Sequence, residues 1–387
     1  MSNKIKTLTD VNLKNKRVIV RVNFDVPIDE KGNIEDDFRI RESLPTINYL
    51  IKNRCKIVLI SHLGRPEGKR MKKYSLLPVR ERLKKLLNQE IYFADRLSFK
   101  SIHKISDKLE GGEILLLENL RFDIYEEENS LQFAEELAKL GEIFINEAFP
   151  VCHREHASIV GIPKFLPSIA GFCLKKEIEE LNKILFHPQR PLIAIIGGAK
   201  ISTKVKVINK FLHIADRVLI GGALANTIFA RQGYNLADST IDIDAFEEVD
   251  KINLKNRKLF LPIDLSIWDG EKVSYRDLGN LSKGEKALDI GLKTIDLFAS
   301  LARNAKTVVW NGPLGLTTQP PFDRASKELV EALEKSRAYK IAGGGDTLSF
   351  IHAIKKEKVF DYLSTGGGAM LDYLAEGTLP GIEPLKK

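Results

Sequence analysis

The stretch RPLIAIIGGAKISTK, residues Arg190–Lys204, decides the fold. Its segment Leu192–Ile196 is short and wholly apolar, which is typical of a strand buried on both faces of a parallel sheet. The strand is predicted to end at Gly197 and Gly198, and apolar residues then recur at helical spacing. A buried strand, a glycine turn and a helix are the repeating unit of α/β proteins.

The turn itself is a candidate phosphate site. Ser202 and Thr203 suit the first turn of the helix, so we expect free backbone N–H groups there. Lys200 and Lys204 add positive charge beside them, and helix N-termini bind anions. For this turn alone, a tight connection with two surface lysines is the alternative.

Composition narrows the class of protein. The 387 residues exceed what one core usually supports, so two domains are expected. The net charge of +8 favours an acidic ligand, but the lysines are scattered among 52 acidic residues, and nothing supports nucleic acid as a partner. Cys55, Cys152 and Cys173 form no CxxC pair, and neither a signal peptide nor an apolar stretch of about 20 residues is found. We expect a cytoplasmic protein without a disulfide framework or a membrane segment.

The βα pattern recurs along both halves of the chain. It predicts an α/β fold of two doubly wound parallel-sheet (Rossmann-like) domains joined by a hinge helix. We expect the first domain at residues 1–170, an interdomain helix at 171–186 and the second domain at 187–378. Ligands are expected at the carboxyl ends of the strands.

In the first half, predicted strands end in polar and cationic residues. Asn23 and Asp25 are two apart and share a face of an extended chain, although polar pairs are also common in turns. Four cationic residues follow strands and Arg39 opens a helix; the four are His62, Arg65, Arg121 and Arg154. Each is more often a surface charge when considered alone, but together they suit a small anion with phosphate or carboxylate groups.

In the second half, the strand ends carry glycine, which suits a nucleotide. Asp346 follows three glycines and is a candidate Mg²⁺ ligand, because Mg²⁺ bound to phosphates takes one or two protein carboxylates. Thr347 is expected to cap the next helix and to donate to phosphate. Neither GxxxxGK[ST] nor GxGxxG after a strand is present, which argues against a P-loop enzyme and a dinucleotide dehydrogenase.

Two further motifs have simple interpretations. His153 and His156 have i,i+3 spacing, but no third zinc ligand is apparent, so metal is disfavoured. The run Glu126-Glu127-Glu128 is expected to be a solvated charged segment.

Nine segments in order along the chain resemble the signatures of phosphoglycerate kinases: RVNFDVP, RIRESLPTI, SHLGRP, ENLRF, HREH, GGAKIST, WNGPLG, GGGDT and STGGGA. The resemblance implies reversible phosphoryl transfer between ATP and the carboxylate of 3-phosphoglycerate, giving 1,3-bisphosphoglycerate and ADP, by a monomer in glycolysis and its reversal. It also implies closure of two domains about the hinge helix, and a tail, residues 379–387, that returns to the first domain. No general base is needed, because the attacking carboxylate is already ionised near pH 7.

The resemblance assigns roles residue by residue. The acid would be bound by Asn23, Phe24, Asp25, Arg39, His62, Leu63, Gly64, Arg65, Arg121 and Arg154. The nucleotide would be bound by Gly198, Lys200, Lys204, Gly222, Asn311, Pro313, Thr318, Gly344, Gly345, Asp346 and Thr347. Catalysis would fall to Arg39, Lys200 and Lys204, with Asp346 holding Mg²⁺.

The chain departs from the family pattern in three places. Asn23 and Asp25 exchange the usual Asp and Asn, Thr318 replaces an acidic residue that resembles a ribose ligand, and Glu147-Ala148-Phe149-Pro150 replaces Asp-Ala-Phe-Gly. Proline there removes a backbone donor. Two other readings stay open: a homologue that binds nucleotide or acid without catalysis, and a nucleic-acid binder suggested by the basic pI alone.

Overall fold

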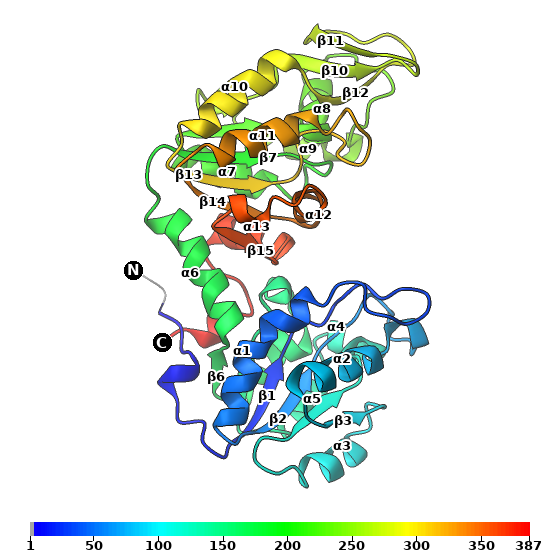
Figure 1. The fold of residues 1–387 in the computed structure, drawn as a ribbon, viewed down its shortest axis with the longest axis vertical. Coiled ribbons are helices and arrows are strands. Elements are labelled where there is room, and N and C mark those ends of the chain that lie inside the picture. Colours follow the sequence, from blue (N-terminus) through cyan, green and yellow to red (C-terminus); the bar gives the residue numbers. More distant parts are fainter. Residues whose placement is uncertain (1–3) are drawn as a thin grey trace. The chain divides into compact units, whose positions relative to one another are not determined.

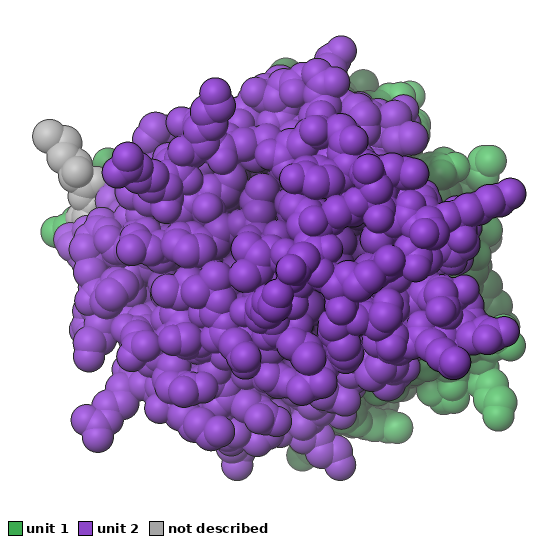
Figure 2. All heavy atoms as spheres, turned by 90° about the horizontal axis from the view of Figure 1, so that it is seen from above, with its two compact units in different colours: residues 1–179, 378–387 green, residues 180–377 purple. Residues whose placement is uncertain are grey.

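The computed structural model describes residues 4–387, and the chain divides into two compact units (Figures 1 and 2). Unit 1 comprises the described residues up to Glu179 together with Thr378–Lys387, and unit 2 is Glu180–Gly377. Each unit contains a six-stranded parallel sheet, so the predicted fold class is confirmed. Within residues 4–387, no helix combines the length and the apolar character that crossing a bilayer requires.

Unit 1 is built on a sheet of strand order β3-β4-β2-β1-β5-β6. The strands are β1 (Arg17–Arg21), β2 (Lys56–Ile60), β3 (Ile91–Ala94), β4 (Ile114–Leu117), β5 (Ile143–Asn146) and β6 (Ser168–Ala170). Its helices are α1 (Phe38–Lys52), α2 (Leu77–Leu87), α3 (Phe99–Ser106), α4 (Ile124–Glu127) and α5 (Leu131–Ala138). Helix α6 (Phe172–Phe186) begins in unit 1 and ends in unit 2.

Alternate residues of the central strands enter two different cores. Val18 and Val20 of β1 belong to a cluster with apolar residues of α1 and α2, whereas Ile19 belongs to a cluster with α3 and α5. Both faces of the sheet are therefore covered. This explains why the strands read as continuous apolar runs.

Unit 2 repeats this plan with strand order β15-β14-β13-β7-β8-β9. The strands are β7 (Leu192–Ile196), β8 (Arg217–Ile220), β9 (Leu259–Phe260), β13 (Thr307–Asn311), β14 (Tyr339–Gly343) and β15 (Tyr362–Ser364). The helices are α7 (Val205–Ile214), α8 (Gly222–Arg231), α9 (Phe246–Asp250), α10 (Leu292–Arg303), α11 (Arg324–Glu334), α12 (Gly345–Ala353) and α13 (Gly368–Glu376).

The register of this second sheet brings the strand ends level. Asn311 of β13 pairs with Ile196 of β7 and with Gly343 of β14. Ile196 in turn pairs with Ile220 of β8. The turns that follow four adjacent strands therefore leave the sheet at the same height, which allows them to contact one another.

Unit 2 also contains a small antiparallel sheet that the sequence reading missed. It has the order β11-β10-β12, with β10 (Asp264–Trp268), β11 (Val273–Asp277) and β12 (Lys286–Ile290). Asp264 opens β10 shortly after β9 ends at Phe260. Its buried carboxylate accepts hydrogen bonds from the amides of Lys293 and Thr294 at the start of α10.

The C-terminal segment packs within unit 1. The amide of Lys6 donates to Leu385 O at 2.7 Å, and the amide of Gly381 donates to Cys152 O at 2.8 Å. Asn146, the last residue of β5, donates through Nδ2 to Gly381 O at 3.1 Å.

Glu147, one of the departures from the family pattern, lies buried against the start of α6. Its carboxylate accepts hydrogen bonds from the Thr46 hydroxyl at 2.5 Å and from the Cys173 amide at 3.1 Å. Burial raises the pKa of Glu147 to about 8, although these hydrogen bonds act in the opposite direction. A Cβ at Gly171 would overlap Glu147 Oε2, so a side chain there would have to displace this carboxylate.

Candidate functional sites

The first candidate site lies at the carboxyl edge of the unit 1 sheet. Strands β4, β2, β1 and β5 are neighbours, and each is followed by a segment with predicted acid ligands. Arg121 follows β4, His62 and Arg65 follow β2, Asn23 and Asp25 follow β1, and Arg154 follows β5. The fold therefore brings together residues that are up to 131 positions apart in sequence.

Arg121 is held in place while part of its guanidinium lacks a protein partner. It is 2% exposed, donates from Nη1 to Gly64 O at 2.8 Å, and has Nε 3.3 Å from Glu127 Oε1. Among residues 4–387, neither Arg121 Nη2 nor Arg154 Nε has a hydrogen-bond partner, although both atoms are buried. Buried donors are normally satisfied, so these two nitrogens point to an anionic ligand.

His62 is 3% exposed and electrically neutral. Burial holds its pKa well below the ordinary value, and the nearby positive charges of Arg21, Arg121 and Arg154 act in the same direction. Arg21 Nη2 lies 3.0 Å from His62 Nδ1. Because a guanidinium can only donate, Nδ1 is the acceptor and the proton is on Nε2. Nε2 lies 3.8 Å from Asp25 Oδ2.

The Asp25 side chain contacts the loop after β2 and the start of α1 at this edge of the sheet. Its Oδ1 accepts from the Gly64 amide at 2.8 Å, and its Oδ2 lies 3.7 Å from Arg39 Nη1. Arg39 also donates to the Asp25 backbone oxygen. Gly64 has φ +62°, and a side chain there would overlap the ring of Tyr74. The carboxylate at position 25 thus orders the loop after β2 as well as Arg39.

The remaining predicted acid ligands differ in exposure. Phe24 and Leu63 are buried in the core, so any contact with a ligand would come from their backbone. Asn23 is 7% exposed, whereas Arg65 is on the surface.

Three buried residues next to the candidate acid site were not predicted from the sequence. Arg21 is the last residue of an otherwise apolar strand and is 0% exposed, and Ser158 and Glu126 are equally buried. The prediction that Glu126 lies in a solvated charged run is wrong, because its carboxylate accepts from the Ser158 hydroxyl at 2.5 Å and from the Ser158 amide at 2.9 Å. The signal was Arg21 itself, since a strand buried on both faces has no place for an unpaired guanidinium.

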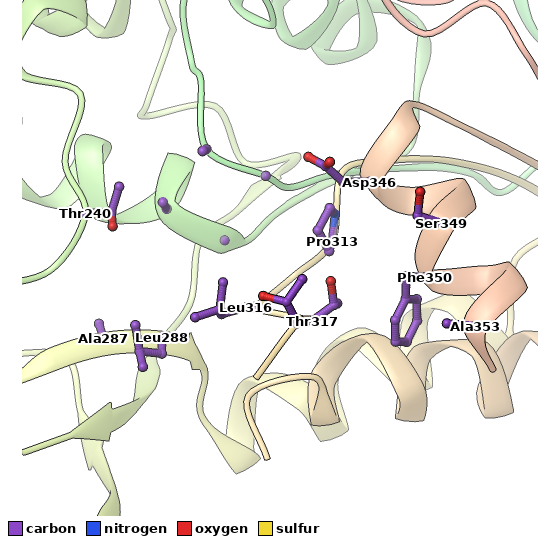
Figure 3. Close-up of a pocket in the computed structure, with 16 residues that line it drawn as sticks. Thr240, Ala287, Leu288, Pro313, Leu316, Thr317, Asp346, Ser349, Phe350 and Ala353 are labelled. Atoms are coloured by element: carbon purple, nitrogen blue, oxygen red, sulfur yellow. The ribbon is translucent and has the colours of Figure 1, made fainter. Parts of the chain in front are cut away.

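The second candidate site is a cavity of about 690 Å³ in unit 2 (Figure 3). Asp346, Ser349, Phe350 and Ala353 of α12 line one side, and Ala287 and Leu288 of β12 line another. Among the residues that line it, Asp346 alone carries a charge. The size and the apolar lining suit a nucleotide base and sugar.

The glycine turns that border this cavity pack directly on one another. The Gly198 amide donates to Pro313 O at 2.8 Å, and the Gly222 amide donates to Leu314 O at 2.7 Å. A Cβ at Gly222, whose φ is +67°, would lie 2.7 Å from Gly198 N. The amides of Gly198 and Gly222 are therefore used within the fold.

The lysines of the first turn have different environments. Lys200 is exposed, whereas Lys204 is 8% exposed and donates to Gly197 O. Burial lowers the pKa of Lys204 to about 8, and Asp346 opposes that shift. Helix α7 begins only at Val205, so Ser202 and Thr203 lie in the preceding turn, where the Lys204 amide donates to Ile201 O.

The loop from β14 to α12 also differs from expectation. Helix α12 begins at Gly345, which puts Asp346 in its first turn, and Gly344, with φ +99°, is the N-cap. Thr347 does not cap the helix, because its buried hydroxyl accepts from the Gly312 amide at 2.7 Å. Asn311 Nδ2 donates to Gly343 O at 3.0 Å. Pro313 and the exposed Thr318 both line the cavity.

Asp346 has the environment that Mg²⁺ on a nucleotide needs. Its carboxylate is exposed at a helix start beside the cavity. Residues 4–387 contain no group of three or more His, Cys, Asp or Glu side chains arranged to hold a metal ion. An ion at Asp346 would therefore take most of its ligands from phosphate oxygens and water, which is usual for Mg²⁺.

Comparisons with known proteins agree on one family. The sequence model of the phosphoglycerate kinase family matches residues 8–377. The chain is 42% identical to a phosphoglycerate kinase of Coprothermobacter proteolyticus, with 99% of each chain covered, and 43% identical to one of Aquifex aeolicus over 97% of this chain and 96% of that one. The solved structure of phosphoglycerate kinase from Coxiella burnetii is 35% identical, with a TM-score of 0.87 over 99% of each chain. The chain belongs to the phosphoglycerate kinase family.

Proposed function

We propose that unit 1 binds 3-phosphoglycerate and unit 2 binds ATP or ADP with Mg²⁺ in the phosphoglycerate kinase reaction. The observation that supports this most directly is that unsatisfied buried guanidinium nitrogens occur in unit 1, whereas the apolar cavity beside Asp346 occurs in unit 2. The first arrangement suits a small anion and the second suits a nucleotide. Transfer requires the two ligands to meet, and we keep α6 as the candidate hinge.

For the acid, we propose that cationic groups bind the phosphate and that polar groups orient the rest of the molecule. Arg65, Arg121 and Arg154 are the phosphate ligands, because planar guanidiniums bind phosphate in a bidentate manner. His62, with its proton on Nε2, would donate to the acid together with Arg39. Asn23 and Asp25, and the backbone of Phe24, Leu63 and Gly64, complete the site.

For the nucleotide, we propose that Lys200 contacts the transferred phosphoryl group and that Lys204 supports the turn beneath it. Gly198, Gly222, Asn311, Pro313, Gly344, Gly345 and Thr347 would shape the phosphate-binding wall, and Thr318 would face the sugar. Asp346 would hold Mg²⁺, which supplies charge neutralisation on the phosphates. Arg39 and Lys200 would stabilise the charge that develops during transfer, and Lys204 would add positive potential.

The direct test is a coupled assay. Purified protein is supplied with ATP, Mg²⁺ and 3-phosphoglycerate, and the acyl phosphate is followed through its reductive consumption by NADH. We expect turnover that depends on all three components. Binding of nucleotide and acid without turnover would instead favour the impaired homologue. We also propose that the enzyme is a cytoplasmic monomer, which sedimentation and cell fractionation test.

The exchanged pair after β1 leads to a prediction on acid affinity. Converting Asn23→Asp and Asp25→Asn together restores the family order but removes the carboxylate that contacts Arg39, His62 and the Gly64 amide. We expect KM for 3-phosphoglycerate to change about three- to tenfold, as for one or two hydrogen bonds, while kcat changes less. An unchanged KM, measured by steady-state kinetics, would show that the exchange is neutral.

A further inference from the structure

The three consecutive glutamates of residues 126–128 have three different environments. Glu126 is 0% exposed and bonded to Ser158, Glu127 is half-buried beside Arg121, and Glu128 is exposed. A charge fully removed from water is costly unless it is paired and hydrogen-bonded. The complete burial of Glu126 therefore requires an explanation, whereas the exposed position of Glu128 does not.

Glu126 is connected to the acid site by a chain of buried hydrogen bonds. Arg21 Nε lies 2.9 Å from Ser158 Oγ, and Ser158 Oγ lies 2.5 Å from Glu126 Oε1. Arg21 has only donors, so the serine oxygen accepts from Arg21 and the serine proton goes to Glu126. The direction of the chain is thus fixed.

The other end of the Arg21 guanidinium fixes His62. Nη1 donates to Val22 O at 2.5 Å, and Nη2 donates to His62 Nδ1 at 3.0 Å. With Nε on Ser158, the planar guanidinium is attached at all three nitrogens and cannot rotate away from the imidazole. Burial lowers the pKa of Arg21 to about 10, while the negative charge of Glu126 raises it. Burial also raises the pKa of Glu126, and the positive charge of Arg21 together with the hydrogen bonds from Ser158 opposes that shift, so the two buried groups favour each other's charged form.

We propose that Glu126 is a positioning residue for substrate binding, which acts through Ser158 and Arg21 to hold His62 as the neutral tautomer with its proton on Nε2. In this tautomer the Nε2–H of His62 is a hydrogen-bond donor on the side of Asp25 and the acid. Nε2 then cannot accept a hydrogen bond on that side. The inferred role in substrate binding rests on the proposed acid site, whereas the inferred effect on the His62 tautomer does not.

The first measurement is the tautomer itself. Long-range ¹H–¹⁵N NMR of the full chain distinguishes protonated from unprotonated ring nitrogens. We expect His62 of the unmodified protein to have an unprotonated Nδ1 and a protonated Nε2 at neutral pH. In Glu126→Gln, which keeps the shape of the side chain but removes its charge, we expect a mixture of tautomers or a shifted ring resonance. A protonated Nδ1 in the unmodified protein would overturn the proposal.

The second measurement is kinetic. For Glu126→Gln we expect KM for 3-phosphoglycerate to rise about five- to tenfold, as for the loss of one hydrogen bond to a charged group, with KM for ATP and kcat within twofold. Glu128→Gln is the matched control, because it removes the same charge two residues away on the surface, and it should change neither KM. Equal effects of the two variants, or a fall in kcat alone, would contradict the proposal.

A third variant covers the case in which Glu126→Gln does not fold. Ser158→Ala removes the bridging hydroxyl but leaves the Ser158 amide to bond Glu126. It should change the His62 resonance and KM for 3-phosphoglycerate in the same direction. A normal His62 spectrum in folded Ser158→Ala would show that the chain does not set the tautomer. If the tautomer changes but KM does not, the positioning role fails while the kinase assay remains a separate test of the proposed function.

Discussion

Replacing Lys200 with alanine is expected to lower kcat by about a hundredfold or more, the usual result of removing one group that stabilises transition-state charge. Lys200 follows the glycine turn after β7, and its side chain is exposed. Its removal should therefore leave the fold intact. Steady-state kinetics in the coupled assay measure the change, and KM for ATP should move much less than kcat.

Lys206→Ala is the matched control for this variant. Lys206 is also exposed, lies six residues further on, and forms a surface ion pair with Glu376 at 3.0 Å. Exposed ion pairs contribute little to stability, and the Lys206 ammonium is paired with Glu376 at the end of α13, so its removal should leave turnover unchanged. Near-normal kcat in Lys200→Ala would refute the catalytic role of Lys200.

Arg39→Ala should lower kcat to a similar extent but with an additional signature. Arg39 contacts Asp25 as well as facing the proposed acid site, so its loss also frees Asp25. We therefore expect KM for 3-phosphoglycerate to rise with the fall in kcat, whereas Lys200→Ala should leave that KM almost unchanged. The two variants together separate the acid side of the reaction from the nucleotide side.

The sequence predicted the parallel sheets well because burial on both faces leaves a simple signal. The run at Leu192–Ile196 is a strand with the bounds we predicted, and the equally apolar β2 and β4 are strands of the other sheet. The small antiparallel sheet left no such signal, since β11 is largely exposed and its residues, VSYRD, lack an apolar run. Periodicity reports burial and not hydrogen-bond pairing, so an exposed strand is hard to detect.

The sequence could predict a ligand class for a candidate site where the residue types themselves indicate one. Cations after consecutive strands indicated an anion, and Asp346 beside glycines indicated a nucleotide. Which groups are already used inside the fold was not predictable. The Gly198 amide, the Thr347 hydroxyl and the Lys204 ammonium all bond backbone atoms of the turns, and this depends on how closely three turns approach one another. That approach is a tertiary property without a local sequence pattern.

The close approach of the turns gives the largest expected effect on stability, at Gly312. Its φ is +89°, and a Cβ there would collide with Gly197 O and would also meet Lys204 Nζ. Gly312→Ala should cost about 1–2 kcal/mol for the left-handed backbone and about 1–3 kcal/mol more for the steric conflict with backbone that cannot yield. We expect a fall in Tm of about 4–20 °C, given about 2–4 °C per kcal/mol for a unit of this size.

Gly284→Ala separates the two contributions, because Gly284 has nearly the same φ, +91°, but nothing within 4 Å of its would-be Cβ. Gly284→Ala should lower the free energy of unfolding only by the cost of a left-handed alanine, about 1–2 kcal/mol, and ATP binding should be normal. Gly312→Ala should in addition weaken ATP binding about tenfold or more by calorimetry, because displacing the turn moves Pro313, which lines the cavity. Equal losses of stability in the two variants would mean that the glycines are required for backbone conformation alone. The contact between the turns would then not be what shapes the wall of the nucleotide cavity.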